Sequence, residues 1–503
     1  MGKHKLSQLK MGALISYFTM AFNIVAGLIY TPWMVSKIGQ SNYGLYTLAN
    51  SLIAIFMLDF GLSAAVARFV SKYRAEGRQQ DVNDILGVIY KLYIIIDAVI
   101  LMVLVGVFFF VGNIYKELTP AELHTFKILY VIVALYQLIA FPLTPVDGIL
   151  NAYEKFSQLK LCNLLYRLLS VFSVIGVLIF SSSVVVVILA TVISHLITVF
   201  SKIIIVKFTV PIKINFRASG KATYKKLFSF TAWTTVINIM QRFTHSFAPS
   251  VLGITSGALE IGLYAPAVTL EGYFYTLGQA INGMFLPRVS KYIADKKEDK
   301  ILDLMIKVGR YQAIVLGLAY IGFVCIGKEF MTLWMGKNYV KSYYLAMIIL
   351  FPTLISSTQQ IAKTTVIAKK LIKYQAIGMI FTGTFGLLAS YFVSMKVGAL
   401  GVCLGTAITS IINILFMNVI YKKKAGINVF VFYKKCYLRL VPCYAIGTVI
   451  GLLISKNIHI LGWKGLALKA FLIIISFLAV VYLTYTTKEE KSKLHNSLKK
   501  VIK

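Results

Sequence analysis

The feature that most constrains this chain is a succession of long apolar stretches separated by short polar segments. A stretch of about 20 apolar residues crosses the hydrocarbon core of a bilayer as an α-helix. Fourteen such stretches can be read along the sequence. They lie at 11–36, 43–67, 85–112, 125–150, 161–181, 184–206, 226–254, 260–286, 302–327, 342–367, 374–395, 398–421, 436–455 and 464–486. The sequence therefore predicts an all-α polytopic membrane protein.

The composition excludes the common soluble classes. Hydrophobic residues make up 58% of the 503 residues, whereas soluble domains are about 45–50% apolar and a single core stops growing near 250–300 residues. The connections between the apolar stretches reach about 20 residues at most, which is too short for a soluble catalytic or nucleotide-binding domain. We therefore expect a membrane protein that is not an enzyme.

The net charge of +34 is typical of nucleic-acid-binding proteins, but here it is spread between the apolar stretches instead of forming one patch. With the N-terminus placed in the cytoplasm, 36 of the 52 Lys and Arg residues fall on cytoplasmic segments and 8 on the opposite side. This asymmetry follows the positive-inside rule for an even number of helices. It predicts that both termini are cytoplasmic, with membrane lipids and no nucleic acid as partners.

Cysteine usage gives no sign of a metal or a cofactor. The five cysteines are scattered along the chain without a C-x-x-C pair. We interpret them as small apolar residues of membrane helices. No metal site and no cofactor are predicted.

Three short landmarks occur twice in the same order. Each set brackets a pair of apolar stretches, the first and second in one case and the seventh and eighth in the other, so the repeating unit contains six helices. The landmarks are Pro32, Gly44-Leu45-Tyr46 and Val70-Ser71-Lys72-Tyr73, and then Pro249, Gly262-Leu263-Tyr264 and Val289-Ser290-Lys291-Tyr292.

Because six is an even number, both copies of the unit start on the cytoplasmic side and the repeat is parallel. Such halves are related by an axis along the membrane normal and place the substrate path between them near the bilayer midplane. The predicted division is an N-lobe at 1–207, a cytoplasmic linker at 208–225, a C-lobe at 226–421, and two further helices with a basic tail at 422–503.

Several residues of the second stretch resemble a known family. The run Leu58-Asp59-Phe60-Gly61-Leu62, preceded by Gly44-Leu45-Tyr46 and followed by Arg68, is similar to the N-terminal signature of bacterial polysaccharide repeat-unit flippases. These proteins belong to the multidrug/oligosaccharidyl-lipid/polysaccharide exporter superfamily. Glycines spaced along the twelfth stretch also look like that family's: Gly398, Gly401 and Gly405.

The resemblance implies a transport function. It implies that the chain moves an undecaprenyl-pyrophosphate-linked oligosaccharide from the cytoplasmic to the outer leaflet of a bacterial inner membrane, for O-antigen, capsule or another exported glycan. A polysaccharide polymerase or export machinery would be a further partner. Composition and spacing alone indicate a two-lobed secondary transporter.

A charge at the bilayer centre costs about 2.5–3.5 kcal/mol on insertion scales, so each such residue is a functional candidate. Arg242 lies 16 residues into the seventh stretch, about 24 Å along a helix. His245 and Asn238 share its helical face. An arginine offers five hydrogen-bond donors suited to a pyrophosphate. The alternative is that Arg242 is neutralised by a buried acid.

Two further cations are candidates for contact with the substrate headgroup. They are Arg167 and Lys363, in the fifth and tenth stretches. Both lie nearer the cytoplasmic ends of their helices, so the alternative is that their side chains extend to the interface and contact lipid headgroups.

The acids inside the stretches are candidates for gating or ion coupling. They are Asp59, Asp97, Asp147 and Glu271, with Arg68 grouped with them at the end of the second stretch. Packing between helices is the alternative for each. A coupling ion, either a proton or sodium, would bind at such an acid, and the sequence does not select between the two.

Two other functions compete with the flippase. A cation-coupled multidrug exporter of the same superfamily would favour acids and apolar walls in its cavity, and Arg242 argues against it. A membrane-embedded glycan polymerase or transferase would need a long external loop, and the predicted outer loops do not exceed about 15 residues.

Overall fold

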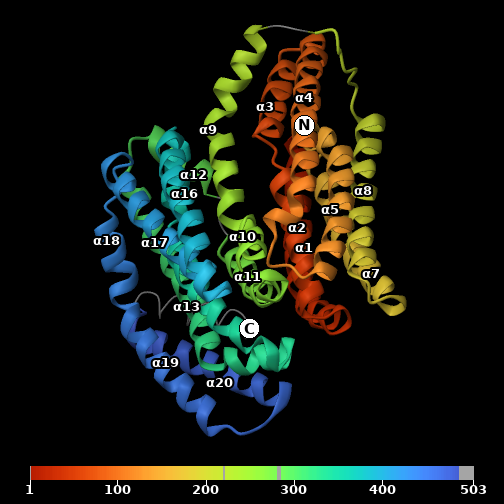
Figure 1. Ribbon diagram of the computed structural model, residues 1–503. Coiled ribbons are helices and arrows are strands. Elements are labelled where there is room, and N and C mark those ends of the chain that lie inside the picture. Colours follow the sequence, from red (N-terminus) through yellow and green to blue (C-terminus); the bar gives the residue numbers. More distant parts are fainter. Residues whose placement is uncertain (1, 219–220, 280–284, 487–503) are drawn as a thin grey trace. The chain divides into compact units, whose positions relative to one another are not determined.

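The computed structural model describes residues 2–218, 221–279 and 285–486, and within these ranges the regular structure is helical, without a strand. In the first part of the chain, long helices alternate with shorter ones (Figure 1). They are α1 (Gly2–Ile38), α2 (Gln40–Phe56), α3 (Leu62–Ala75), α4 (Gln79–Ile114), α5 (Pro120–Ala140), η1 (Phe141–Leu143), α6 (Pro145–Ala152), α7 (Phe156–Phe180) and α8 (Val184–Thr209).

The next part of the chain repeats this order of elements, and a final group follows it. The repeated elements are α9 (Lys221–Ser246), α10 (Ala248–Thr255), α11 (Gly257–Gln279), α12 (Leu286–Ala294), α13 (Asp299–Met335), η3 (Lys337–Tyr339), α14 (Val340–Thr358), α15 (Gln360–Ala368), α16 (Ile372–Val397) and α17 (Ala399–Lys423). The final group is α18 (Val429–Tyr433), the π-helical turn η4 (Lys434–Leu438), α19 (Leu440–Asn457) and α20 (Gly462–Thr484).

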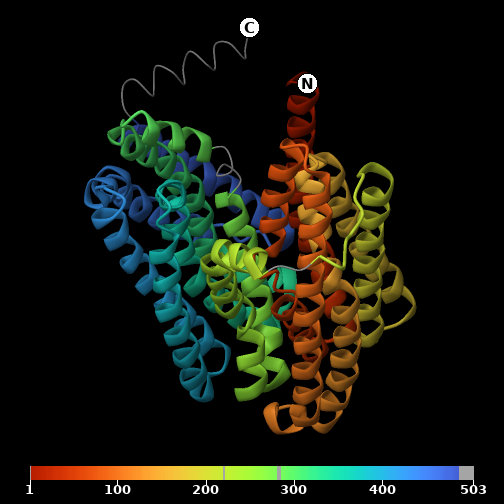
Figure 2. The ribbon, with the colours of Figure 1, turned by 90° about the horizontal axis from the view of Figure 1, so that it is seen from above.

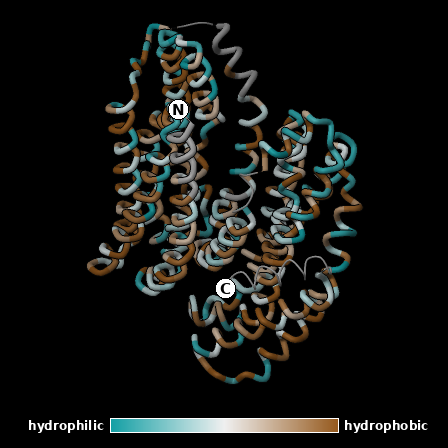
Figure 3. The backbone as a smooth tube through the Cα atoms, turned by 180° about the vertical axis from the view of Figure 1, so that it is seen from behind, coloured by the Kyte–Doolittle hydropathy of each residue, from teal (hydrophilic) through white to brown (hydrophobic). Residues whose placement is uncertain are grey.

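Eleven helical stretches within the described ranges are long and apolar enough to cross a membrane. Apolar segments run along the helices in Figure 3. The prediction of an all-α polytopic membrane protein is confirmed, and the count of fourteen spans is approximate. The predicted stretches outside the eleven are 43–67, which is broken into α2 and α3, 226–254, which is divided between α9 and α10, and 260–286, part of which lies outside the described residues.

The repeat is visible in the local backbone as well as in the element order. Gly39 and Gly257, 218 positions apart, both adopt φ of 83° immediately before α2 and α11. The turns after α6 and α15 are also equivalent, because Glu154 and Lys370 have φ of 60° and 59° at the same place in the turn. Only a few residues tolerate this left-handed conformation without cost, so its recurrence indicates the same turn built twice.

The helices gather into two compact units. The first contains Met1–Ala265 and Met379–Thr406, and the second contains Pro266–Gly378 and Ala407–Lys503. Each has its own buried core, with Tyr93 and Phe141 among the largest buried side chains in the first and Phe432 and Phe477 in the second. The lobe boundaries expected from the repeat remain a prediction.

In the first unit, α2 crosses the segment from α10 to the start of α11 at very short distance. A Cβ atom on Gly44 would contact the backbone of Ala258, with the carbonyl carbon 2.9 Å away, and a Cβ on Gly262 would lie 2.5 Å from the carbonyl oxygen of Gln40. The two contacts are equivalent, because 218 positions separate Gly44 from Gly262 and Gln40 from Ala258. Such reciprocal pairing is characteristic of a two-fold axis, so this glycine crossing supports the parallel relation of the two copies.

The connection from α8 to α9 is fastened to the start of α4, also within the first unit (Figure 2). The side chain of Asn83 accepts a hydrogen bond from the backbone N–H of Lys213 at 3.0 Å, and its carbonyl accepts one from the N–H of Asn215 at 3.2 Å. Farther along α4, the Lys91 ammonium donates to the carbonyl of Ala218 at 3.0 Å. The segment 213–218 is therefore an ordered strap held against α4.

In the second unit, α19 and α20 pack against α13. The Tyr444 hydroxyl donates to the carbonyl of Ala313 at 2.7 Å, and its ring lies over Gly317. An ion pair of 2.6 Å joins Lys469 to Glu329, with the lysine side chain only 7% exposed. Removing a single partner from such a buried pair leaves an uncompensated charge, so these contacts hold the C-terminal helices firmly on α13.

Candidate functional site

The second predicted span is interrupted at Met57–Gly61, between α2 and α3. Phe60 and Gly61 have φ of 48° and 69°, a conformation that ends one helix before the next begins. The freed carbonyl of Phe56 accepts a hydrogen bond from the buried side chain of Gln137 at 2.7 Å. The apolar pattern of the second stretch does not predict this break, which lies inside the run resembling the flippase signature.

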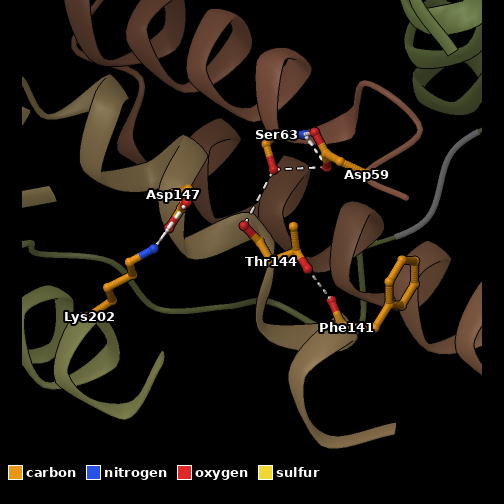
Figure 4. A network of polar contacts seen from close by, with 6 residues as sticks. All are labelled: Asp59, Ser63, Phe141, Thr144, Asp147 and Lys202. Atoms are coloured by element: carbon orange, nitrogen blue, oxygen red, sulfur yellow. Dashed lines mark hydrogen bonds and ion pairs between the residues drawn. The ribbon is translucent and has the colours of Figure 1, made fainter. Parts of the chain in front are cut away.

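Asp59 stabilises the start of α3. Its carboxylate accepts hydrogen bonds from the backbone N–H of Ser63 at 3.1 Å and from the Ser63 hydroxyl at 2.9 Å (Figure 4). It also accepts one from the hydroxyl of Tyr93. Ser63 also donates to the carbonyl of Thr144, ahead of α6. An acid that accepts from the first N–H groups of a helix acts as its cap. The carboxylate thus stabilises the break, and the gating role expected of Asp59 remains a prediction.

We expect Asp59→Ala to destabilise the protein by about 2–4 kcal/mol, because it removes a helix cap and leaves the buried Tyr93 hydroxyl without its acceptor. The measurement is the thermal unfolding of purified protein in detergent. Tyr93→Phe in the Asp59→Ala background should recover part of the loss, since no buried hydroxyl then lacks a partner. Equal stability of Asp59→Ala and wild type would contradict the capping role.

One face of α9 meets the break between α2 and α3. The hydroxyl of Thr235 donates to the carbonyl of Phe60, and a Cβ on Gly61 would lie 2.8 Å from the hydroxyl oxygen of Thr234. Residues three, four and seven positions apart share a helical face. The same face therefore continues to Asn238 and Arg242. We call this set the α9 polar stripe: Thr231, Thr234, Thr235, Asn238 and Arg242.

The predicted substrate-binding residues of α9 occupy the far part of this stripe. Arg242 is exposed and Asn238 half-buried, while the side chain of His245 lies outside the described part of the structure. Among the residues that are described, no acidic side chain pairs with Arg242. The opposite face of α9 packs on α16, where Gly383 approaches Met240 and Thr244. The structure thus does not supply the buried acid that was the alternative for Arg242.

Arg167 lies on α7 and is also exposed. Its guanidinium carbon is 5.3 Å from the centroid of the Tyr166 ring, and the charge is within electrostatic reach of Tyr46 on α2 and His195 on α8. No acid in the described ranges forms an ion pair with it. Arg167 on α7 and Arg242 on α9 lie in the same unit. Helix α9 packs directly on α2, whereas α7 packs on α1 and α8, which both contact α2.

Asp147 forms an ion pair that sequence reasoning missed. The ammonium of Lys202 on α8 lies 2.9 and 3.2 Å from its two carboxylate oxygens (Figure 4). The Lys202 side chain is 12% exposed and that of Asp147 is 42% exposed. Lys202 lies inside the apolar stretch 184–206, near its end, and this position is the sequence signal that indicates an intramembrane charge.

His195 was also missed. Its ring lies against that of Tyr166 at a centroid distance of 3.8 Å, and the ring of Tyr136 is 5.5 Å away. His195 therefore joins α8 to α7 and α5 through aromatic contacts, and a single histidine in an apolar stretch carries no pattern that predicts this.

The remaining candidates are placed as follows. Arg68 is exposed on α3, and Asp97 is half-buried on α4 with one carboxylate oxygen that has no hydrogen-bond partner in the described residues. Glu271 and Lys363 belong to the second unit, where Glu271 accepts a hydrogen bond from Thr353 at 2.9 Å and Lys363 is half-buried on α15. The structure therefore brings Asp59 and Asp147 together in the first unit, joined through Ser63 and Thr144, and leaves the other acids apart from them.

Comparison with known proteins identifies the relatives of this chain. The model of a family described as "Polysaccharide biosynthesis protein" matches residues 11–292, which is more than half of the sequence. The chain is 22% identical over 317 residues to the "Uncharacterized membrane protein EpsK" of Bacillus subtilis (strain 168), covering 61% of this chain and 62% of that protein. It is 26% identical over 211 residues to a "Putative O-antigen transporter" of Shigella flexneri, covering 41% of this chain and 49% of that protein. The matched parts thus span less than two thirds of each relative.

Solved structures share the fold. The lipid II flippase MurJ in an inward closed conformation superposes with a TM-score of 0.73 at 14% identity, covering 94% of this chain and 98% of that one. An inward-facing multidrug resistance MATE family transporter of the MOP superfamily gives a TM-score of 0.66 at 12% identity, covering 82% and 99%. At these identities the likeness shows the architecture of a polytopic membrane protein with this helix order.

Proposed function

The chain belongs to the polysaccharide biosynthesis protein family, and from this premise we propose that it is a flippase for a lipid-linked oligosaccharide. The proposed substrate is an undecaprenyl-pyrophosphate-linked repeat unit, moved from the cytoplasmic to the outer leaflet of a bacterial inner membrane. The similarity to a putative O-antigen transporter and the MurJ-like fold support this class of substrate. The proposed orientation places both termini in the cytoplasm, as the charge distribution indicates.

The proposed mechanism is alternating access between two lobes, 1–207 and 226–421, joined by the linker at 208–225 and followed by 422–503. Parallel repeats of this kind alternate by rocking around a site between them. The repeated element order and the glycine crossing between Gly44 and Gly262 support this division.

The observation that carries the proposal is a pair of exposed arginines, Arg167 on α7 and Arg242 on α9, in one unit and without an acidic partner in the described residues. An unpaired guanidinium group within a membrane protein is costly unless an anion binds there. A diphosphate presents several oxygens in the geometry that arginine binds with two hydrogen bonds. Arg167 and Arg242 would hold the headgroup, with Asn238 and His245 of α9 beside it and Lys363 contacting it during entry.

The membrane potential would drive an anionic headgroup outward. Moving one charge through 100 mV is worth about 2.3 kcal/mol, so a diphosphate with roughly two negative charges gains about 4–5 kcal/mol. Coupling to a proton or sodium through Asp97, Asp147 or Glu271 would add to this free energy. Asp59 and Arg68 would take part in gating. The exposed arginines disfavour a cation-coupled multidrug exporter, whose substrates carry positive charge.

Deletion of the gene with separate analysis of the two leaflets tests the proposal. Complete lipid-linked repeat units should accumulate on the cytoplasmic side, because synthesis continues while translocation stops. Expression of the wild-type chain from a plasmid should restore them to the outer leaflet. Accumulation of incomplete units would instead indicate a glycan transferase, and an unchanged leaflet distribution would exclude a flippase for this glycan.

A further inference from the structure

The polar interior of the first unit contains more positive charge than its ion pair neutralises. Lys202 pairs with Asp147, whereas Arg167 has no acidic partner in the described ranges. Both cations lie within electrostatic reach of His195. Asp147 is therefore paired with Lys202, and the charge of Arg167, which forms no ion pair in the described ranges, would attract an anion.

Arg167 and Lys202 lie on two helices that pack on each other, α7 and α8. These helices form an antiparallel hairpin, and its register is set by the contact of the Tyr166 ring with His195 and by a 3.0 Å hydrogen bond between the hydroxyls of Ser173 and Ser194. Lys202 follows His195 by seven residues, or two helical turns, and so lies on the same face of α8. Its charge also reaches Cys162 on α7. The face of α8 that carries Lys202 is thus turned toward the helix that carries Arg167.

The two partners of the ion pair differ in exposure. The lysine side chain is 12% exposed, but the carboxylate that holds it is 42% exposed. The protein therefore encloses the ammonium more completely than the carboxylate, and the carboxylate is open on one side. A phosphate oxygen can replace a carboxylate oxygen as acceptor for the same ammonium without burying a new charge.

We propose that Lys202 is a third cation of the headgroup site. Asp147 holds its ammonium in an ion pair until the substrate enters, and the ammonium then donates its hydrogen bonds to the diphosphate. This inference rests on the proposed flippase function and adds a residue to its site. In the empty transporter Asp147 keeps the ammonium paired and the site less cationic. On binding, a phosphate oxygen accepts the Lys202 hydrogen bonds in place of the Asp147 carboxylate.

If the ammonium changes acceptor in this way, substitution of Asp147 and substitution of Lys202 should change the affinity for a diphosphate in opposite directions. A purely structural ion pair would make both substitutions unfavourable. The probe is geranylgeranyl diphosphate, with geranylgeraniol as the phosphate-free control, titrated calorimetrically into the purified full-length protein in detergent at fixed ionic strength. Asp147→Asn should tighten binding of the diphosphate, because it frees the ammonium. Lys202→Gln should weaken it by about fivefold or more, the scale of one partly screened charge-assisted hydrogen bond.

Matched variants separate the local effect from a change in net charge. Asp81→Asn removes one negative charge from the exposed start of α4, and Lys207→Gln removes one positive charge from the exposed end of α8. Each control substitution should change the logarithm of the Kd for geranylgeranyl diphosphate by less than half as much as the substitution that it matches. The matched substitutions are Asp147→Asn for Asp81→Asn and Lys202→Gln for Lys207→Gln. The double variant Asp147→Asn/Lys202→Gln should bind like Lys202→Gln alone, since Asp147 acts through the ammonium.

The outcomes distinguish this inference from the function on which it rests. Wild-type protein that does not bind geranylgeranyl diphosphate overturns the proposed diphosphate site itself. Wild-type protein that binds it, with unchanged affinity in Lys202→Gln or weaker binding in Asp147→Asn, overturns the role of Lys202 alone. Thermal unfolding of each variant is measured in parallel, and Lys202→Arg, which retains the charge, should keep binding within about threefold of wild type if the ammonium acts mainly as a charge.

Discussion

Arg242→Ala should abolish export of the glycan while the protein remains in the membrane at normal abundance. The side chain is exposed on α9 and pairs with no acid in the described residues, so its removal leaves no buried group unsatisfied and should not unfold the helix. Losing a charged hydrogen-bond donor to a phosphate costs about 1.5–3 kcal/mol, or roughly 10–150-fold in affinity. The readouts are surface glycan by blotting and the leaflet distribution of lipid-linked repeat units.

Two further variants define what Arg242 contributes. Arg242→Lys keeps the charge and loses the planar fork, so partial export is expected. Arg217→Ala removes an exposed arginine from the linker and serves as the matched control with normal export. Normal export by Arg242→Ala would remove this residue from the headgroup site.

Gly44→Leu and Gly262→Leu should each prevent the close crossing of α2 and α11. The first Cβ atom already meets the backbone of Ala258 in one case and that of Gln40 in the other. Backbone atoms cannot move aside as a flexible side chain can, so the helices must separate. Overpacking of this kind typically costs about 1–3 kcal/mol and sometimes more. We expect a clear fall in unfolding temperature and loss of export for both variants, with similar magnitudes because the two positions are equivalent.

Glycines in open surroundings provide the comparison. A Cβ on Gly106 or Gly176 would meet no atom within 4 Å, and both lie in membrane-spanning helices of the same unit. Gly106→Leu and Gly176→Leu should therefore unfold at the wild-type temperature or slightly above it, since glycine is a poor helix former. Full stability and export in Gly44→Leu would show that the crossing is not needed in any state of the cycle.

Much of the fold was predictable because its signals are local. Eleven of the fourteen apolar stretches match helices that could span a membrane, since hydrophobic length decides whether a helix crosses lipid. The six-helix repeat was readable from landmarks such as Gly44 and Gly262, because only glycine permits their close backbone contact. The family suggested by the run around Asp59 is also confirmed.

The rest of the site could not be predicted because it depends on contacts between distant segments. Asp59 caps α3 and receives a hydrogen bond from Tyr93, 34 residues away, and Lys202 meets Asp147 across 55 residues. Hydropathy shows that a charge lies within a membrane helix but not which helix face it occupies or what it pairs with. The same limit applies to Arg242, whose face became clear only through the contact of Thr235 with the break before α3.

The ordered strap restricts how the second half of the chain can move. Ala218 is fixed to α4 through Lys91, and two residues separate it from Lys221, where α9 begins. Consecutive Cα atoms are at most about 3.8 Å apart, so the first residue of α9 stays within about 11 Å of Ala218 in any conformation. This short connection limits how far the start of α9 can move from α4, so we expect α9 to change position mainly by tilting about its first turn. The largest displacement along α9 then falls at its far end, where Arg242 lies.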